Sequence, residues 1–198
     1  MKGVVYTLFN RMIEERFGLP AWEQLLERAQ LRSGGIYTAG AVYDDAELFA
    51  LVRELEQVSG VEQAELVRTF GEYLIGAFGR FHPEMFTGTD TKSFLRSVDA
   101  VIHTEVLKLH PGALLPRFDY EDPGPGALVM LYRSPRGLCH LAEGLITGAA
   151  WQYRERAVVR HEVCMHRGAD HCRLEIRLAP IGAAADPATA TDRGSAVA

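Results

Sequence analysis

The chain has 198 residues, of which 47% are hydrophobic and 24% charged, the balance of an ordinary soluble globular protein. Its length predicts one domain, or one domain with appendages. Asp and Glu number 26 against 21 Lys and Arg, so the net charge is −5, and the basic residues form no cluster. These values exclude collagen-like, coiled-coil and wholly disordered classes, and we expect no nucleic-acid partner.

Neither a membrane span nor a secretory leader is expected. No apolar run approaches the ~18 residues of a membrane-spanning helix. The apolar segment 1–10 lacks a small-residue cleavage site, and the charged residues Arg11 and Glu14 follow at once. The three cysteines are an odd number and all lie in the last third of the chain, which does not suit a disulfide framework. We therefore expect a cytoplasmic protein with reduced thiols, and the cysteines raise the possibility of a metal site.

The first 110 residues predict helices. Gly18-Leu19-Pro20 is expected to stop the first helix, and Asp44-Asp45 to cap a later one that ends at Ser59-Gly60. Apolar residues recur at helical spacing over segments 8–17, 22–29, 45–59, 61–78 and 90–109.

From residue 117 the pattern predicts strands, over 117–120, 127–132, 156–164 and 172–178, with a turn at 121–126 and one helix over 139–151. The fold class is therefore α+β, with an N-terminal helical subdomain packed on a C-terminal antiparallel sheet with helices. We place the domain at 1–180 and a disordered, low-complexity tail at 181–198.

One histidine, His103, lies off the main apolar face of the predicted helix 90–109. At 100° per residue it is roughly 130° from the centre of that face. It is therefore either exposed, as lone helical histidines usually are, or covered by something other than the main core. The apolar face consists of Phe94, Leu95, Val98, Val101, Ile102 and Leu109.

Tyr132, Ser134 and Arg136 alternate along an extended segment, so their side chains point the same way. They offer a phenol, a hydroxyl and a guanidinium, three donors that suit paired carboxylates or a phosphate. The competing interpretation is a strand end that enters solvent, where Ser134-Pro135 makes an ordinary turn.

The order and spacing of His103, Pro116 and Tyr132-x-Ser134-x-Arg136 resemble the signature of haem nitric oxide/oxygen-binding (H-NOX) domains. These domains are bacterial relatives of the haem domain of soluble guanylate cyclase. The resemblance implies a haem b buried between the helical and sheet halves, with His103 as the axial ligand of the haem iron. It also implies that Tyr132, Ser134 and Arg136 bind the haem propionates, and that the stiff Pro116 distorts the porphyrin.

The distal pocket implied by the resemblance lacks a hydrogen-bond donor. Oxygen-binding members carry a distal tyrosine five residues after the arginine of the triad, and Leu141 occupies that position here. Tyr73 and His140 are adjacent donors, but a helical neighbour points about 100° away. The resemblance thus favours a nitric oxide sensor that excludes stable dioxygen binding. The distal residues expected are Val5, Phe9, Leu74, Phe78, Leu141 and Leu145.

A second candidate site is a zinc centre formed by Cys139, His161, Cys164 and Cys172, since three cysteines and one histidine make a normal structural zinc site. Some H-NOX members carry such a site. An ideal strand would place 161 and 164 on opposite faces, so a bulge is required. The alternatives are three buried, inert cysteines, or a different histidine ligand: His140, His166 or His171.

The leading functional prediction is a haem-based nitric oxide sensor, not an enzyme, that regulates a separate signalling partner. The resemblance implies a histidine kinase or a cyclic-di-GMP enzyme, that is, a diguanylate cyclase or phosphodiesterase. The alternative is a haem-independent zinc/thiol redox sensor on the same fold. A haem peroxidase is less favoured, because the distal side supplies no acid–base pair.

Overall fold

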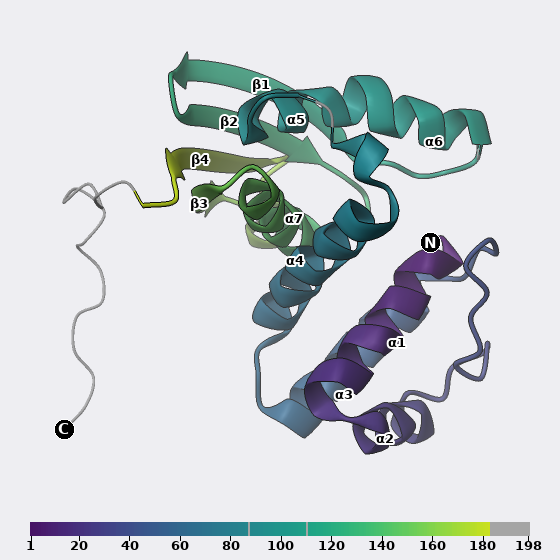
Figure 1. Ribbon diagram of the computed structural model, residues 1–198. Helices are drawn as coiled ribbons and strands as arrows, with labels where there is room; N and C mark the ends of the chain where they lie inside the picture. The colour runs from purple at the N-terminus through teal and green to yellow at the C-terminus, as the bar shows by residue number, and fades with distance from the viewer. Residues whose placement is uncertain (87, 110, 183–198) are drawn as a thin grey trace, which may run out of the picture.

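The computed structural model describes residues 1–86, 88–109 and 111–182. Figure 1 shows a group of N-terminal helices at one end of the molecule and a four-stranded sheet at the other, with a long helix, α4, running between them. This arrangement confirms the predicted α+β class. The N-terminal helices are α1 (Gly3–Phe17), α2 (Leu19–Ala29), α3 (Asp45–Ser59) and α4 (Gln63–Phe81).

Local signals explain both ends of α3 and the junction of α1 with α2. Asp44 accepts a hydrogen bond from the N–H of Ala46 at 3.0 Å, the predicted cap of α3. Gly60, at φ 71°, ends that helix in the left-handed conformation. The predicted stop of the first helix is confirmed, since α1 ends at Phe17, but the next helix begins earlier than expected, at Leu19. Gly18 alone separates α1 from α2, because Pro20 lies in the first turn of α2, where a missing N–H costs nothing.

The predicted single helix over 90–109 contains a turn of π-helix. It consists of α5 (Thr91–Ser97), the π turn η2 (Val98–His103) and α6 (Thr104–Leu109). A π turn holds more residues than an α turn, so the 100° spacing fails beyond Ser97. Val101, which we expected on the buried face, is 50% exposed for this reason.

The sheet is antiparallel in the order β1-β2-β4-β3, and β4 pairs with both β2 and β3. Tyr132 of β2 lies directly opposite Cys172 of β4. β1 runs through much of the segment predicted as a turn, with a register irregularity between Glu121 and Gly124. The strands are β1 (Arg117–Gly124), β2 (Ala127–Arg133), β3 (Glu155–Val163) and β4 (Cys172–Pro180); short 3₁₀ turns are η1 (Pro83–Met85) and η3 (Met165–Arg167).

Helix α7 (Cys139–Gln152) joins the two halves by packing closely on α4 (Figure 1). A Cβ atom on Gly144 would lie 1.9 Å from the backbone oxygen of Arg68, and one on Gly71 would lie 2.4 Å from that of Leu141. The contact therefore requires glycine on both helices. Leu145 of α7 packs against both the helical core and the sheet core.

No helix within the described residues is long and apolar enough to cross a membrane. Most of the predicted disordered tail, from residue 183 onward, lies outside the described residues. The domain limits 1–180 and 181–198 therefore stay a prediction.

Candidate functional site

A cavity of about 790 Å³ brings together the residues on which the resemblance depends. His103, Pro116, Tyr132, Ser134 and Arg136 all line it, although they come from η2, β2 and the segments flanking the sheet strands. Residues at the N-terminal end of the chain, including Val5, close the cavity from the helical side. Its walls are mainly apolar, with polar groups confined to a few positions, as in typical cofactor pockets.

The side chain of His103 is only 14% exposed, so the expectation of an exposed helical histidine is wrong. It lines the large cavity and also, with Phe94 and Leu95 of the apolar face, a smaller cavity. Its Nδ1 lies 3.0 Å from Oδ1 of Asp99, one helical turn earlier. Its ring stacks on Phe118 with a centroid separation of 5.6 Å. The carboxylate engages Nδ1 and leaves Nε2 as the nitrogen available to a metal, which is the usual arrangement of a metal-binding histidine.

Tyr132, Ser134 and Arg136 lie on one wall of the cavity. Tyr132 and Ser134 are buried, and burial raises the pKa of the Tyr132 phenol to about 12, so this group is a donor at neutral pH. Arg136 donates from Nε to Asp45 at 2.5 Å and from Nη1 to the carbonyl oxygen of Leu114 at 2.5 Å. The triad is therefore an ordered group of donors rather than a strand end in solvent.

Asp45 is a functional candidate that the sequence analysis assigned only to helix capping. Its carboxylate contacts Arg136 through Oδ2 and the N-terminal amine of Met1, at 2.6 Å, through Oδ1. Burial raises the pKa of Asp45, but the hydrogen bonds from the amine and from Arg136 outweigh it and hold the pKa below its usual value. Asp45 thus fixes Arg136 at the rim of the cavity.

The residues expected around the distal side are split between two cavities. Val5, Leu141 and Leu145 line the large cavity, and Leu145 also lines an adjacent cavity of about 170 Å³ with Leu74 and Phe78. Among the described residues lining this smaller cavity, His103 is the only polar side chain.

Phe9 is not among the described residues that line either cavity. It is fully buried in the helical core, with its ring centroid 5.0 Å from that of Phe70. The resemblance implied that Phe9 faces the distal pocket, but α4 covers its ring. The nearby donors Tyr73 and His140 also line neither cavity.

The combination of groups in the large cavity fits a haem. An imidazole with its Nδ1 already engaged, apolar walls and a set of donors suited to carboxylates are what an iron porphyrin with two propionates requires. The roles of the individual residues nevertheless stay predictions.

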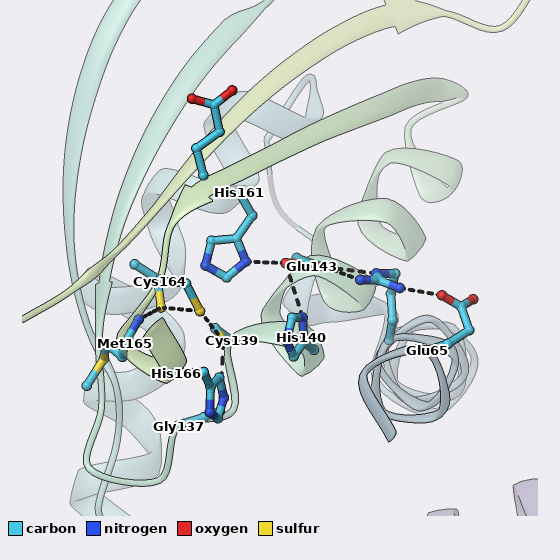
Figure 2. Close-up of polar contacts among 12 residues, drawn as sticks. Glu65, Gly137, Cys139, His140, Glu143, His161, Cys164, Met165 and His166 are labelled. Carbon is cyan, nitrogen blue, oxygen red and sulfur yellow. Dashed lines mark hydrogen bonds and ion pairs between the residues drawn. The ribbon is translucent and has the colours of Figure 1, made fainter. Parts of the chain in front are cut away.

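The four predicted zinc ligands converge on one point. One ligand atom from each of Cys139, His161, Cys164 and Cys172 lies within 4.8 Å of those of the other three. The sulfur of Cys164 is 3.9 Å from each of the other two sulfurs. The strand irregularity that this convergence needs is present, since the pairing of β3 with β4 shifts between Arg160 and Val163. Figure 2 shows the ring of His161 between the cysteines and Glu143.

The chemistry of this cluster fits a soft dication. Burial and the neighbouring thiols raise the pKa of Cys139 well above its usual range, and burial also raises the pKa of Cys172. A cation beside these two thiols would favour their thiolate forms. His161 is 9% exposed at its side chain, and its Nε2 is buried without a hydrogen-bond partner.

The rival histidines are less well placed. Nε2 of His166 lies 2.7 Å from the carbonyl oxygen of Gly137, and His171 contacts Asp170. His140 and His166 do form another possible group with Cys139. His140 also has a buried ring nitrogen, Nδ1, without a hydrogen-bond partner, but among the described residues only His161 has a ring nitrogen that converges with all three cysteine sulfurs.

A family model described as Haem-NO-binding matches residues 2–161, well over half of the chain. The protein belongs to this family. H-NOX domains are haem-based sensors of nitric oxide and oxygen and are not themselves catalytic.

Solved H-NOX structures match almost the whole chain. An H-NOX protein from Shewanella oneidensis in the Fe(II)NO ligation state is 32% identical, with a TM-score of 0.83 over 90% of this chain and 99% of that one. An unliganded Fe(II) H-NOX protein from K. algicida is 27% identical, with a TM-score of 0.83 over 90% of this chain and 97% of that one. The H-NOX from Shewanella woodyi, bound to IWP-051, is 36% identical, with a TM-score of 0.78 over 93% of this chain and 97% of that one.

Longer proteins also match. Soluble guanylate cyclases gcy-34 and gcy-35 of Caenorhabditis elegans are 23% and 24% identical over 76% and 80% of this chain. The chain spans only about a quarter of the length of these cyclases, 23% and 24% respectively.

A further residue that the sequence analysis missed is Glu143 of α7. Its carboxylate is 6% exposed and contacts Arg68, His140 and His161. Burial raises the pKa of Glu143, but hydrogen bonds from the two histidines and Arg68 outweigh this and hold the pKa far below its usual range. No motif marks this residue, because two of its partners, Arg68 and His161, lie on α4 and β3, away from it in the sequence.

Proposed function

We propose that this H-NOX protein senses nitric oxide, does not bind dioxygen stably, and passes its signal to a separate protein. The observation that carries the proposal is that the cavity-lining residues expected on the distal side are all apolar. Leu74, Phe78 and Leu145 line the smaller cavity, which has no hydroxyl, amide or indole donor among its described lining residues, and Leu141 lines the large cavity. Bound dioxygen carries partial negative charge and is stabilised by a hydrogen-bond donor, whereas bound nitric oxide depends much less on such a donor.

The proposed roles of the residues follow from their places in the large cavity. His103 would hold the iron through Nε2, with Asp99 orienting the ring. Tyr132, Ser134 and Arg136 would bind the propionates, and the stiff ring of Pro116 would press on the porphyrin. Bound haem would supply a ferrous iron with an open coordination position for a diatomic gas.

An optical experiment tests the gas selectivity. The ferrous, haem-loaded protein should show a Soret band that shifts with nitric oxide and does not change on mixing with air. Leu141→Tyr places a phenol beside the large cavity, and a net gain of about 1 kcal/mol from a new hydrogen bond should give detectable oxygen binding or altered autoxidation. Leu141→Phe adds the same ring without the hydroxyl and is the matched control. A stable oxygen complex in the wild-type protein would overturn the proposal.

The signalling partner is proposed from the family resemblance to be a histidine kinase or a cyclic-di-GMP enzyme. The guanylate cyclase relatives, of which this chain matches about a quarter, support the idea of a sensor unit joined to a separate output. The test is kinase autophosphorylation, or cyclic-di-GMP turnover, measured with the haem-loaded protein with and without nitric oxide. An unchanged rate for each candidate enzyme would contradict this part of the proposal.

We also propose a structural zinc ion at Cys139, His161, Cys164 and Cys172, supported by the convergence of their ligand atoms and the unpartnered Nε2 of His161. Metal analysis of the purified protein should give one zinc per chain. Membership of the Haem-NO-binding family gives no support to the haem-independent redox sensor considered as the alternative.

A further inference from the structure

The buried carboxylate of Glu143 divides its two oxygens between two neighbours on different elements. Oε2 accepts from Nε and Nη2 of Arg68 on α4, both at 2.8 Å. Oε1 accepts from Nδ1 of His161 on β3 (Figure 2). His140 approaches the same oxygen at 3.4 Å. Glu143 therefore joins α4, α7 and β3 through a single side chain.

A lone buried carboxylate is costly, and a buried ion pair often stabilises a fold no better than apolar residues would. Its presence here needs a reason beyond folding stability. Metal-binding histidines usually donate their second ring N–H to a carboxylate, which fixes the ring orientation and the free nitrogen. His161 has this arrangement: Nδ1 faces Glu143, and Nε2, without a partner, belongs to the group that converges with the three cysteine sulfurs.

We propose that Glu143 is a positioning residue for the Cys139/His161/Cys164/Cys172 zinc site, and that the chain Arg68–Glu143–His161 fastens this site to α4. The proposal rests on the zinc site of the proposed function. Glu143 does not touch the metal; it acts by holding the imidazole of His161 in the orientation that binds zinc.

Both the side chain and the backbone of Arg68 are held in place on α4. Its guanidinium is held by Glu143 and also by Glu65 on the same helix. Its backbone oxygen is covered by Gly144, which leaves no room for a Cβ. Two turns later along α4, Leu74 and Phe78 line the smaller apolar cavity. The zinc site is thus connected, through two side chains, to the helix that forms a wall beside the gas-binding region.

Glu143→Gln tests the positioning role, and Glu65→Gln is the matched control, since Glu65 binds the same arginine but does not contact His161. The probes are zinc and cobalt(II) alone, with affinity measured by competition against a chromophoric chelator and geometry by the cobalt visible spectrum. We expect Glu143→Gln to weaken metal binding by about 10- to 100-fold, the usual effect of losing such a carboxylate, and to change the cobalt spectrum. Glu65→Gln should stay within about twofold of wild type, well below that range.

The outcomes separate the two proposals. A wild-type protein that contains no zinc and binds neither metal overturns the zinc site and the positioning role together. Wild-type binding with equal affinity in Glu143→Gln overturns the positioning role alone, because an ion pair that only stabilises the fold would lower the melting temperature without altering the metal site.

Hydrogen exchange tests whether the zinc site is attached to α4. It does not need the Glu143→Gln variant, so it can be measured even if that variant does not fold. Removing zinc from the wild-type protein should speed exchange in α4 peptides around Arg68 as well as in β3. Arg68→Met keeps the contact between Glu143 and His161, so zinc removal should then speed exchange in β3 as in the wild-type protein, and in α4 less than in the wild-type protein. Unchanged α4 exchange in the wild-type protein after zinc removal would overturn the attachment.

Discussion

Gly144→Ala should destabilise the protein by forcing α4 and α7 apart. The new Cβ would lie 1.9 Å from the backbone oxygen of Arg68 and 2.9 Å from the Cα of Gly71, and neither backbone atom can turn aside as a side chain would. Overpacking of this kind costs about 1–3 kcal/mol, and a backbone clash belongs at the upper end. The higher helix propensity of alanine stabilises the folded state by about 1 kcal/mol and offsets part of this cost. The net loss is about 2 kcal/mol, or about 4–8 °C in melting temperature for a chain of this size.

Gly76→Ala is the matched control for this substitution. Gly76 lies in α4, and a Cβ there would meet nothing within 4 Å. The same propensity gain of about 1 kcal/mol should therefore raise the melting temperature by about 2–4 °C. Both variants are followed by circular dichroism at equal haem loading. If Gly144→Ala melts at or above the wild-type temperature, the described contact between the helices does not exist.

Three further substitutions address the cavity. His103→Gly should lose the wild-type ferrous spectrum and regain a five-coordinate one with added imidazole; a wild-type spectrum without imidazole would mean that another residue holds the iron. Arg136→Ala should transfer haem faster to apomyoglobin, because charge-assisted hydrogen bonds worth about 1.5–3 kcal/mol are lost; unchanged transfer would count against propionate binding. Asp45 has a lowered pKa, so its stabilising contribution is present above its ordinary value of 3.8 and is lost as the pH falls below it. The wild-type protein should therefore melt at a higher temperature than Asp45→Asn at pH 6, and this difference should shrink towards pH 3. A difference that does not depend on pH would show that the charge of Asp45 is not involved.

Local signals in the sequence were enough for most of the fold. The cap at Asp44 and the glycine stop at Gly60 act within a few residues, so they could be read without knowledge of the tertiary structure. The bulge before Val163 was also predictable, because the proposed ligands could not otherwise share a face. The π turn could not be predicted, since its altered periodicity is visible only once the helix has packed.

Residues whose roles depend on distant partners escaped the sequence analysis. Asp45 lies 91 positions from Arg136, and Glu143 lies 75 positions from Arg68. Phe9 was expected in the distal pocket because of the family resemblance, but the resemblance did not reveal that Phe70 of α4 would cover its ring. The contact between Asp99 and His103 could have been predicted from the sequence, because the two residues are four positions apart on a predicted helix.

The pairing of Tyr132 with Cys172 has a consequence for how the binding of haem and of the proposed zinc ion would affect each other. Because the two residues face each other across β2 and β4, the donor proposed for haem and a ligand proposed for zinc share one pair of neighbouring strands, and both are buried in the sheet core. If one ligand alters these strands and so changes the affinity for the other, thermodynamics requires the effect to be reciprocal. Whatever factor zinc contributes to the affinity for haem, haem contributes to the affinity for zinc. The fraction of molecules able to sense a gas would then depend on the zinc available when the protein acquires its haem.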